Sequence, residues 1–548
     1  MKTIIVGGVA CGASCAARLR RLDENREIII IEKGGYVSYA NCGLPYFVAD
    51  EIKRDNDILL NTKESFKDKY NIEVRLNEEV VSVNPEKKEI TVLKGGNTYI
   101  ENYDDLVLSP GLKPIMLKLP NFDSPYLVKL KNVSDALSLK KRIVKEKIKS
   151  VIMIGGGYIG MELSEALTNA GIAVTVIELA DHIIGPLDND FALIAQKECL
   201  KRGLMIKTSE SVQGIELDPL RVITDKGEYP CDLVVSNVGN VPDTAFLESS
   251  GIERNKRGYI KVNENGETSI KDIYAGGDAT RYKDYIFGEE TQIALASIAN
   301  KQGRMIADKI MNLPSQEKIG MYACSILKLF SLNIAMLGYN KKQLLTKNIS
   351  FHEELITGYN HASYYPDAEE MFIKVYYDDE YQLLGAQIIG GGYVDKKIDV
   401  LTTLMYYKKP LLTLTDIPFA YAPMFNSAKD LLNMLGYVLE NKKNNLLKDI
   451  DYSEIDFSEE NLLIDVRTER EYQHGHLKNF INIPLQELRE RLDEVKALAK
   501  GKKIYLHCKT DVRSYLALRI LSQKGLDCYN VRGGYDYLSL VHQEDVIK

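Results

Sequence analysis

The first 32 residues combine apolar runs, a glycine turn and an acidic residue in an order that predicts a defined unit. Residues 2–8 form an apolar, β-branched run that leads into the turn Gly7 to Gly12, and an Ala- and Arg-rich segment follows. A second apolar run over residues 27–31 ends at Glu32. This order predicts strand, turn, helix and strand, with an acidic residue about 20 positions after the turn.

The same order returns in stricter form between residues 151 and 178. Residues 151–154 predict a strand, Gly155, Gly157 and Gly160 complete a GxGxxG turn, and a helical pattern and a second strand lead to Glu178. In the first copy Val9 stands at the middle glycine position. Glycines at these positions let backbone N–H groups reach a pyrophosphate at a helix N-terminus, so the sequence predicts two dinucleotide sites.

The rest of the chain divides into further segments. Apolar runs at 103–111, 231–239 and 273–278 end in glycine turns, and the last carries Asp278, which indicates one nucleotide domain interrupted by the second and resumed near residue 245. Residues 320–440 alternate β-rich segments with a helical pattern at 393–407, and the polar stretch 440–445 predicts a linker. Runs at 462–467 and 503–508 predict strands of a separate small α/β domain.

Composition narrows the class of protein. The 548 residues are 45% hydrophobic and 27% charged, as expected for globular domains, and the net charge of -7 argues against a nucleic-acid surface. No apolar run approaches the roughly 18 residues of a membrane span, and the first residues lack the pattern of a signal peptide, so we expect a cytoplasmic protein. The eight cysteines are scattered without metal-ligand spacing, so we expect mostly free thiols and no metal site.

Cys42, within residues 38–45, is the most informative cysteine because it follows the first nucleotide unit and stands alone. Its disulfide partner must therefore come from a bound molecule, a peroxide or another protein. The residue types leave four interpretations open: a buried inert thiol, a sulfenic acid, a thiolate that attacks an S–S bond, and a metal ligand.

These motifs together resemble a known family. Residues 1 to about 440 resemble the pyridine nucleotide–disulfide oxidoreductase superfamily, in its single-cysteine coenzyme A-disulfide reductase branch. The segment Asp465-Val-Arg467, Gly475-His476 and residues 507–514 resemble a rhodanese domain. The resemblance implies an α/β fold with two nested Rossmann-like dinucleotide-binding domains, an α+β dimerisation domain and a rhodanese-like α/β domain. The expected boundaries are 1–115 with 245–319 for FAD, 116–244 for NAD(P)H, 320–440 for homodimerisation, 441–455 for a linker and 456–548 for the rhodanese-like domain.

The resemblance also implies where two cofactors bind. FAD would occupy the first glycine turn and NAD(P)H the second. The implied cofactor-binding residues are Gly7, Gly8, Val9, Ala10, Gly12, Glu32, Lys33, Val80, Ser109, Gly111, Gly155, Gly157, Tyr158, Ile159, Gly160, Glu178, Gly239, Gly277 and Asp278. Glu178 would accept a hydrogen bond from a free ribose 2′-OH and repel a 2′-phosphate, and no Arg or Lys follows over residues 179–182. We therefore expect NADH rather than NADPH.

The resemblance assigns roles around Cys42. A thiolate there would attack coenzyme A-disulfide, a persulfide or polysulfide, which requires a lowered pKa. NADH oxidases and peroxidases, which form a sulfenic acid, carry a histidine at the position of Ala10 here.

The implied acid–base tyrosines come from the partner subunit and match Tyr364 and Tyr421, with Tyr365 as the neighbouring alternative. The implied coenzyme A contacts are Ser14, Arg18, Arg21, Ser38, Asn41 and Lys429. Arg18 and Arg21 lie three apart on a predicted helix, so they share a face suited to a phosphate. Asn300 stands where the family often has a histidine near the substrate.

Cys508 is the second predicted catalytic cysteine, with Arg513 in the same loop. A strand that ends in cysteine and runs into a helix directs several N–H groups at the sulfur, which stabilises a thiolate and then a persulfide. Asp511 occupies a position usually held by glycine, and its charge should disfavour thiosulfate as a donor.

Taken together, these motifs lead us to expect an FAD enzyme that uses NADH to reduce disulfide, persulfide or polysulfide sulfur at Cys42, with coenzyme A as substrate or covalent cofactor. The alternatives are an NADH oxidase and a flavin-linked redox sensor.

Overall fold

The computed structural model describes residues 1–314 and 322–548. The chain forms two compact units, one comprising Met1–Gly185 and Cys199–Ala323 and the other Pro186–Glu198 and Cys324–Lys548. Within the described ranges, no helix combines the length and the apolar character that crossing a bilayer requires. The boundary predicted at residues 319–320 lies outside the described residues, and the domain boundaries as a whole stay predictions.

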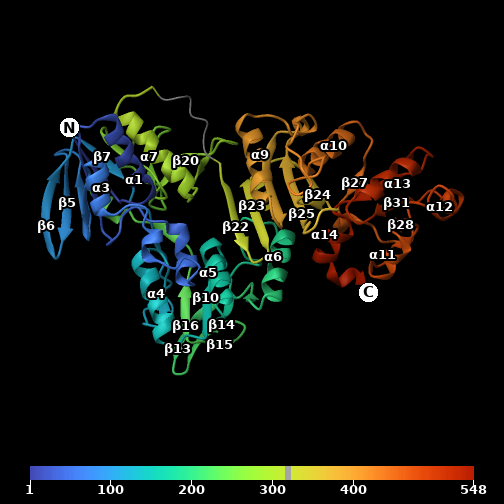
Figure 1. The fold of residues 1–548 in the computed structure, drawn as a ribbon, viewed down its shortest axis with the longest axis horizontal. Coiled ribbons are helices and arrows are strands. Elements are labelled where there is room, and N and C mark those ends of the chain that lie inside the picture. The colour runs from blue at the N-terminus through green and yellow to red at the C-terminus, as the bar shows by residue number, and fades with distance from the viewer. Residues whose placement is uncertain (315–321) are drawn as a thin grey trace. The chain divides into compact units, whose positions relative to one another are not determined.

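The first unit contains a parallel five-stranded sheet built around the first glycine turn (Figure 1). Its strands in spatial order are β19 (Ile273–Ala275), β7 (Asp105–Leu108), β1 (Lys2–Val6), β2 (Glu27–Glu32) and β3 (Glu73–Leu76). Ile4 and Ile5 point to opposite faces of β1 and are both fully buried, as is usual for a parallel sheet covered on both sides. The helices that follow or cover these strands are α1 (Ala10–Leu22), α2 (Leu44–Val48), α3 (Lys63–Tyr70) and α7 (Ala296–Ile310).

A second parallel sheet in the first unit surrounds the stricter glycine turn. Its strands in spatial order are β12 (Met205–Lys207), β11 (Ala173–Ile177), β10 (Ser150–Ile154), β16 (Leu233–Ser236) and β9 (Leu127–Val128). Helices α4 (Val133–Lys145) and α5 (Tyr158–Asn169) belong to this part of the chain. An antiparallel three-stranded sheet accompanies each parallel sheet. The one in the first nucleotide part consists of β4 (Glu78–Asn84), β5 (Glu89–Lys94) and β6 (Asn97–Asn102). The one in the second consists of β13 (Val212–Leu217), β14 (Leu220–Thr224) and β15 (Glu228–Pro230).

The second unit opens with an antiparallel sheet. Its strands in spatial order are β22 (Cys324–Leu329), β23 (Leu332–Gly338), β26 (Leu383–Gly390), β25 (Glu370–Tyr377) and β24 (His352–Tyr359). The unit also contains α6 (Asn189–Lys201) for most of its length, α8 (Lys341–Thr346), α9 (Val394–Tyr406) and α10 (Leu431–Lys443). This segment combines an antiparallel sheet with helices, and α8 stands between β23 and β24 along the chain. The α/β class of the chain is confirmed.

A smaller parallel sheet follows within the same unit. Its strands in spatial order are β27 (Asp449–Ile450), β32 (Cys528–Val531), β31 (Lys503–His507), β28 (Asn461–Asp465) and β30 (Ile481–Asn482). Helices α11 (Glu469–Gln473), α12 (Leu492–Ala499), α13 (Val512–Ser522) and α14 (Gly534–Val541) surround it (Figure 1). The polar stretch 440–445 includes the end of α10, which continues to Lys443, and β27 pairs with β32 a few residues later. The linker boundaries 441–455 stay a prediction.

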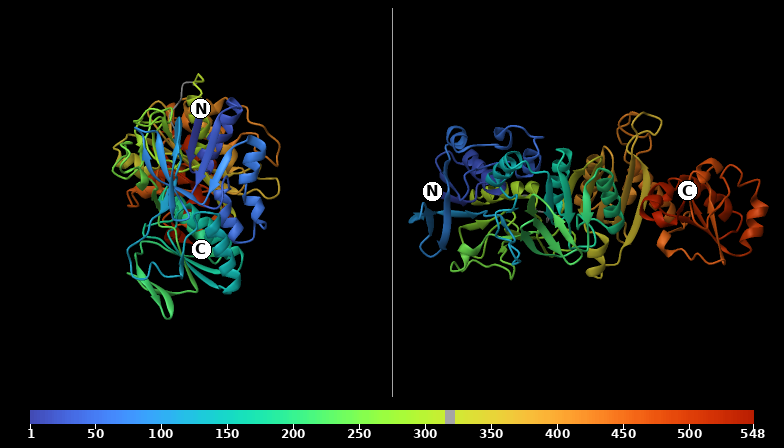
Figure 2. Two further views of the ribbon diagram at one scale, coloured as in Figure 1. Left: turned by 90° about the vertical axis from the view of Figure 1, so that its left-hand side faces the viewer. Right: turned by 90° about the horizontal axis from the view of Figure 1, so that it is seen from below.

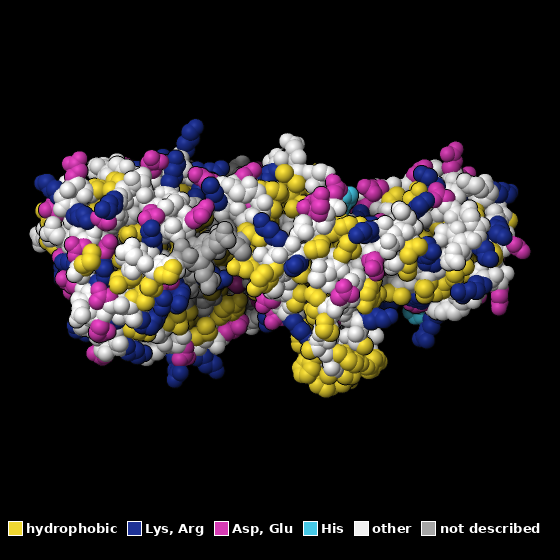
Figure 3. All heavy atoms as spheres, turned by 90° about the horizontal axis from the view of Figure 1, so that it is seen from above, with side chains coloured by type: hydrophobic (Ala, Val, Ile, Leu, Met, Phe, Trp, Pro, Cys, Tyr) yellow, Lys and Arg dark blue, Asp and Glu magenta, His cyan; other side chains and the backbone are white. Residues whose placement is uncertain are grey.

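The second unit carries a projecting lobe whose surface is mainly hydrophobic in Figure 3. The right-hand view of Figure 2 draws this projection as loops in the gold and orange of the unit's middle segment. The large hydrophobic side chains exposed in this segment include Tyr364, Tyr365, Tyr421, Met424 and Phe425. Apolar patches of this kind commonly mark interaction surfaces.

Candidate functional site

Both glycine turns are formed by close backbone approaches that leave no room for a side chain. Gly7 has φ of +91°, and a Cβ at this position would lie 2.2 Å from the carbonyl oxygen of Ser109. A Cβ at Gly12 would lie 1.9 Å from the Gly7 oxygen. The second turn repeats this geometry: Gly155 has φ of +101°, and a Cβ at Gly160 would lie 2.2 Å from the Gly155 oxygen. Only glycine therefore permits the tight turn that places a helix N-terminus at the end of each sheet.

The acidic residue after each turn is hydrogen-bonded in the same way. Glu32 accepts from the Gly8 N–H at 2.9 Å and from the Gly34 N–H at 2.8 Å. Glu178 accepts from the Gly156 N–H at 2.6 Å and from the Ala180 N–H at 2.8 Å. Each carboxylate is thus held beside its turn, which fits a dinucleotide whose pyrophosphate and ribose lie there.

The remaining predicted cofactor residues fall into three groups. Val9 and Ala10 form the start of α1, and Tyr158 and Ile159 the first turn of α5. The Ser109 hydroxyl donates to the Gly7 oxygen at 2.9 Å, and the Gly277 N–H, next to Asp278, donates to the Gln302 side-chain oxygen at 2.6 Å. Gly111 and Gly239 occupy loops after β7 and β16, Lys33 forms an ion pair with Asp243, and Val80 is buried in β4.

A cavity of about 580 Å³ opens beside Cys42 in the first unit. Cys42 lies in the short turn Asn41–Gly43 directly before α2, and its side chain is exposed. The lining residues are Val9, Ala10, Ala13, Ser14, Ala17, Arg21, Ser38, Tyr39, Ala40, Asn41, Cys42, Leu60, Asn61, Phe66, Tyr70, Ala296, Asn300 and Arg304. The structure thus brings the predicted substrate residues Ser14, Arg21, Ser38 and Asn41 to one cavity with Cys42 and Asn300, and the predicted cofactor residues Val9 and Ala10 line the same cavity.

Arg18 is placed differently from its neighbour Arg21. It does not line the cavity, and its Nε donates to Asp308 Oδ1 of α7 at 2.6 Å. Sequence analysis missed Arg304, which lines the cavity one turn after Asn300 on the same face of α7. The i, i+4 spacing from Asn300 was the available signal.

The pKa of the Cys42 thiol is raised in this structure, and the lowering that a thiolate nucleophile requires is not found. Burial by the cavity walls raises the pKa of this thiol although its side chain is accessible, and the carboxylates of Glu162 and Asp278 raise it further. Glu162 accepts a hydrogen bond from the Tyr46 hydroxyl at 3.2 Å, and burial raises the pKa of Glu162 as well. Glu162, which sequence analysis did not single out, therefore belongs to the surroundings of Cys42.

The predicted tyrosines form a pair in the second unit. The hydroxyls of Tyr364 and Tyr421 lie 2.9 Å apart, and the two side chains are 73% and 49% exposed. The neighbouring Tyr365 instead packs its ring edge-on against His361. Lys429 is exposed in the same segment. Between the two tyrosines considered at 364 and 365, the geometry favours Tyr364 as the partner of Tyr421.

Cys508 directly follows strand β31, which ends at His507, and the loop from Cys508 leads into α13. The thiol is fully buried and accepts a hydrogen bond from the Ser514 hydroxyl at 3.3 Å. Burial and the Asp511 carboxylate raise the pKa of Cys508, while Ser514 and the Thr510 N–H counteract them. The loop does offer the predicted N–H groups, but their effect does not exceed that of burial.

Asp511 and Arg513 each have protein partners in this loop. The Asp511 carboxylate accepts from the Gly533 N–H at 2.9 Å, and burial raises its pKa to about 7. Arg513 binds Glu471 through two N–H groups, each at 2.7 Å. That ion pair lowers the pKa of Glu471 to about 2, so the charge of Arg513 is compensated within the protein.

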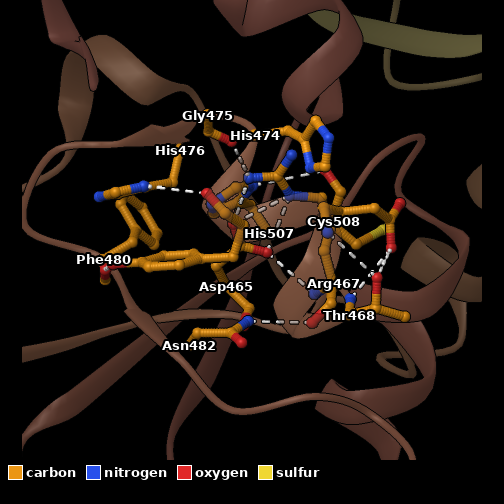
Figure 4. A network of polar contacts seen from close by, with 12 residues as sticks. Asp465, Arg467, Thr468, His474, Gly475, His476, Phe480, Asn482, His507 and Cys508 are labelled. Carbon is orange, nitrogen blue, oxygen red and sulfur yellow. Dashed lines mark hydrogen bonds and ion pairs between the residues drawn. The ribbon is translucent and has the colours of Figure 1, made fainter. Parts of the chain in front are cut away.

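A buried polar network supports the Cys508 loop (Figure 4). Asp465 at the end of β28 accepts from the Arg467 Nε at 2.9 Å and from its NH2 group at 2.6 Å. Arg467 also donates to the Gly475 oxygen at 2.8 Å, and its guanidinium lies over the Tyr535 ring at 3.8 Å. The neighbouring His476 stacks on Tyr472 with ring centres 3.8 Å apart. This network fixes the turn after β28 beside the strand that carries Cys508.

Comparison with known proteins places this geometry in a family. Residues 1–303 match the model of the family described as pyridine nucleotide-disulphide oxidoreductase. Residues 448–539 match the model of the rhodanese-like domain. A coenzyme A disulfide reductase of Staphylococcus aureus is 33% identical over 440 residues, which covers 80% of this chain and 99% of that protein. The chain belongs to the pyridine nucleotide-disulphide oxidoreductase family and carries a rhodanese-like domain.

Two solved structures extend the likeness to both parts of the chain. The reduced CoADR-RHD of Bacillus anthracis has a TM-score of 0.96 and 38% identity, covering 100% of this chain and 99% of that one. A NAD-dependent persulfide reductase from A. fulgidus has a TM-score of 0.91 and 30% identity, covering 98% and 100%. The predicted family is confirmed. Membership implies FAD and NAD(P)H, which the two glycine turns and their bonded acidic residues fit.

Proposed function

We propose that this chain reduces disulfide and persulfide sulfur at Cys42 with electrons from NADH, and that its substrates are coenzyme A-disulfide, coenzyme A persulfide and polysulfide. The cavity beside Cys42 carries the proposal. The exposed thiol of Cys42, small neutral residues such as Ala13 and Ala17, and the cations Arg21 and Arg304 all line this cavity. A thiol on a long neutral arm that ends in phosphates matches this set of groups.

The reaction divides into exchange and reduction. The Cys42 thiolate attacks one sulfur of the substrate S–S bond, a mixed disulfide forms, and the other sulfur leaves as a thiol after it takes a proton. Bound FAD would supply the electron pair, taken from NADH, that releases the second thiol and restores Cys42. Glu162 lies in the electrostatic surroundings of Cys42 and is suited to accept or return a proton there.

The choice of NADH and the role of the tyrosines belong to the same proposal. Glu178 beside the second turn favours a ribose with a free 2′-OH over one with a 2′-phosphate. The exposed hydrophobic lobe supports a homodimer, in which Tyr364 and Tyr421 of one subunit serve the Cys42 cavity of the other. Their bonded hydroxyls supply a proton donor for the departing thiolate.

Cys508 would carry sulfane sulfur as a persulfide. Thiolate attack on a donor persulfide moves its terminal sulfur to Cys508 and releases the donor thiol, with no net change in electrons. The Ser514 hydroxyl and the Thr510 N–H support the anionic form of this sulfur.

The test is anaerobic NADH oxidation with a panel of sulfur acceptors, using two variants as controls for each other. Cys42→Ser should lose reduction of every acceptor but keep FAD binding. Cys508→Ser should keep reduction of coenzyme A-disulfide and lose sulfur transfer from persulfide donors. Loss of both activities in Cys508→Ser would overturn the division of roles, and rapid turnover by Cys42→Ser would overturn the role of Cys42.

A further inference from the structure

The cavity beside Cys42 is elongated along two helices that contribute matching faces. Helix α1 supplies Ala10, Ser14, Ala17 and Arg21, and the rise along the helix separates the first from the last by about 16 Å. Helix α7 supplies Ala296, Asn300 and Arg304, which occupy one face at i, i+4 and i+8, over about 12 Å. Ser14 and Asn300 are hydrogen-bonded to each other, which joins the two faces midway.

Three arginines lie on or near this wall, and the ion pairs distinguish them. Arg18 is bound to Asp308 at 2.6 Å and is only 19% exposed at its side chain. Arg304 lies 4.0 Å from the same carboxylate and is 60% exposed. Because Arg18 takes the strong hydrogen bond to Asp308, the guanidinium of Arg304 keeps its donors for a ligand. Within the described residues, Arg21 has no ion-pair partner.

We infer that Arg304, together with Arg21, binds a phosphate group of the thiol substrate whose sulfur reacts at Cys42. This inference rests on the proposed function and adds a specificity-determining residue to it. The two arginines occupy the last positions that α1 and α7 contribute to the cavity wall, so they meet the charged end of a ligand whose thiol lies at Cys42. Arginine presents paired N–H groups that match phosphate oxygens, and its charge persists at every working pH.

The middle of the cavity supports the same ligand class. Ala13 and Ala17 present no charged group, and Ser14, Asn61 and Asn300 offer neutral polar atoms. Such a wall suits an amide-containing arm and gives no reason to bind a small inorganic disulfide tightly. Arg304 should therefore separate phosphorylated from unphosphorylated thiols by affinity, while the chemistry at Cys42 is the same for both.

The experiment measures binding by calorimetry to the Cys42→Ser holoenzyme, so that no covalent bond forms. Coenzyme A and pantetheine are the two probes, since they share the thiol arm and differ in the phosphates. Arg304→Gln should weaken coenzyme A binding about tenfold, as expected for loss of a charge-assisted hydrogen bond, and leave pantetheine binding unchanged. Lys301→Gln is the matched control, because Lys301 lies on α7 but does not line the cavity.

Kinetics with Cys42 intact provide an independent readout. Arg304→Gln should raise KM for coenzyme A-disulfide about tenfold with kcat unchanged, and Arg304→Lys should recover part of the loss. Higher salt should narrow the difference between wild type and Arg304→Gln. Equal weakening of both probes, or no weakening, would overturn the inference. Failure of coenzyme A to bind when Arg304 is intact would instead overturn the proposed function itself.

Discussion

A buried ion pair anchors the segment that carries Tyr421 and Lys429, and its removal is a sharp test of that segment. The Lys397 ammonium group of α9 is bonded to the Asp430 carboxylate, and both residues are 1% exposed. Asp430 is also the N-cap of α10, where it accepts from the Leu432 N–H at 2.7 Å. Replacing Lys397 by Met keeps the volume and the cap but leaves the carboxylate of Asp430 buried without its cation.

The magnitude follows from this burial. Removing one partner of a fully buried pair costs about 3–5 kcal/mol, because the remaining charge has lost its compensation. At about 1.4 kcal/mol per factor of ten, local opening should become about a hundred- to a few thousand-fold more frequent. Lys397→Met combined with Asp430→Asn should restore most of the loss, since the neutral amide still accepts the Leu432 N–H and no charge stays uncompensated.

Hydrogen exchange measured by mass spectrometry is the suitable assay, because a chain with several domains does not unfold in one step. Peptides from Leu431–Lys443 should lose protection in Lys397→Met and regain it in the double variant, while peptides from α1 stay unchanged as an internal control. If Lys397→Met lowers the protection of α10 by less than tenfold, the reasoning about the buried pair is refuted. If the segment serves catalysis, the same variant raises KM for coenzyme A-disulfide.

Two further predictions follow from the titrating groups near the two thiols. Glu162→Gln removes a carboxylate that raises the pKa of Cys42, so the midpoint of a pH profile for alkylation of Cys42 should move to lower pH; a midpoint that stays or rises contradicts this. Burial raises the pKa of Asp511 from 3.8 to about 7, so its stabilising contribution is complete below about pH 4 and is lost as the pH rises through 7. Asp511→Asn should therefore gain thermal stability over wild type at pH 8 and lose most of that advantage at pH 5, and an advantage independent of pH would contradict the assignment.

The parts of the site that sequence analysis found are those written in short stretches of chain. The turn at Gly155 and its acidic residue Glu178 lie within 24 residues of each other. A hydrogen bond from the backbone N–H next to Gly155 to the Glu178 carboxylate joins them. Cys42 and Cys508 each follow a recognisable strand-to-helix order. Local spacing is sufficient in these cases because the residues that define the feature are neighbours along the chain.

The parts that sequence analysis missed depend on contacts between distant segments. Arg18 and Arg21 were expected to act together because they share a helical face, but Asp308, 290 residues away, binds Arg18. Arg304 reaches the cavity only because α7 packs beside α1. The spacing along α7 places Arg304 on the face of Asn300, but only the packing of the two helices decides that Asp308 binds Arg18 and leaves Arg304 at the cavity.

The lowered pKa expected for Cys42 is not found, and at Cys508 the predicted N–H groups lower the pKa by less than burial and Asp511 raise it. Motif reasoning counted the N–H groups that stabilise a thiolate, but burial and nearby carboxylates raise the pKa of Cys42 and of Cys508. The two sites differ in access: Cys42 is exposed to a cavity of about 580 Å³, whereas Cys508 is fully buried beneath its loop.

This difference in access constrains what each thiol can exchange. The exposed sulfur of Cys42 opens onto a cavity of about 580 Å³, so the proposed mixed disulfide with a large thiol has room to form there. The full burial of Cys508, whose thiol accepts a hydrogen bond from the Ser514 hydroxyl, favours acceptance of a single terminal sulfur atom over a bulky disulfide. Because both sulfurs rest as thiols, exchange at each site requires loss of a proton first. The rate of either half-reaction should therefore rise with pH until the thiol is ionised, with Cys42 following the charge of Glu162 and Cys508 that of Asp511.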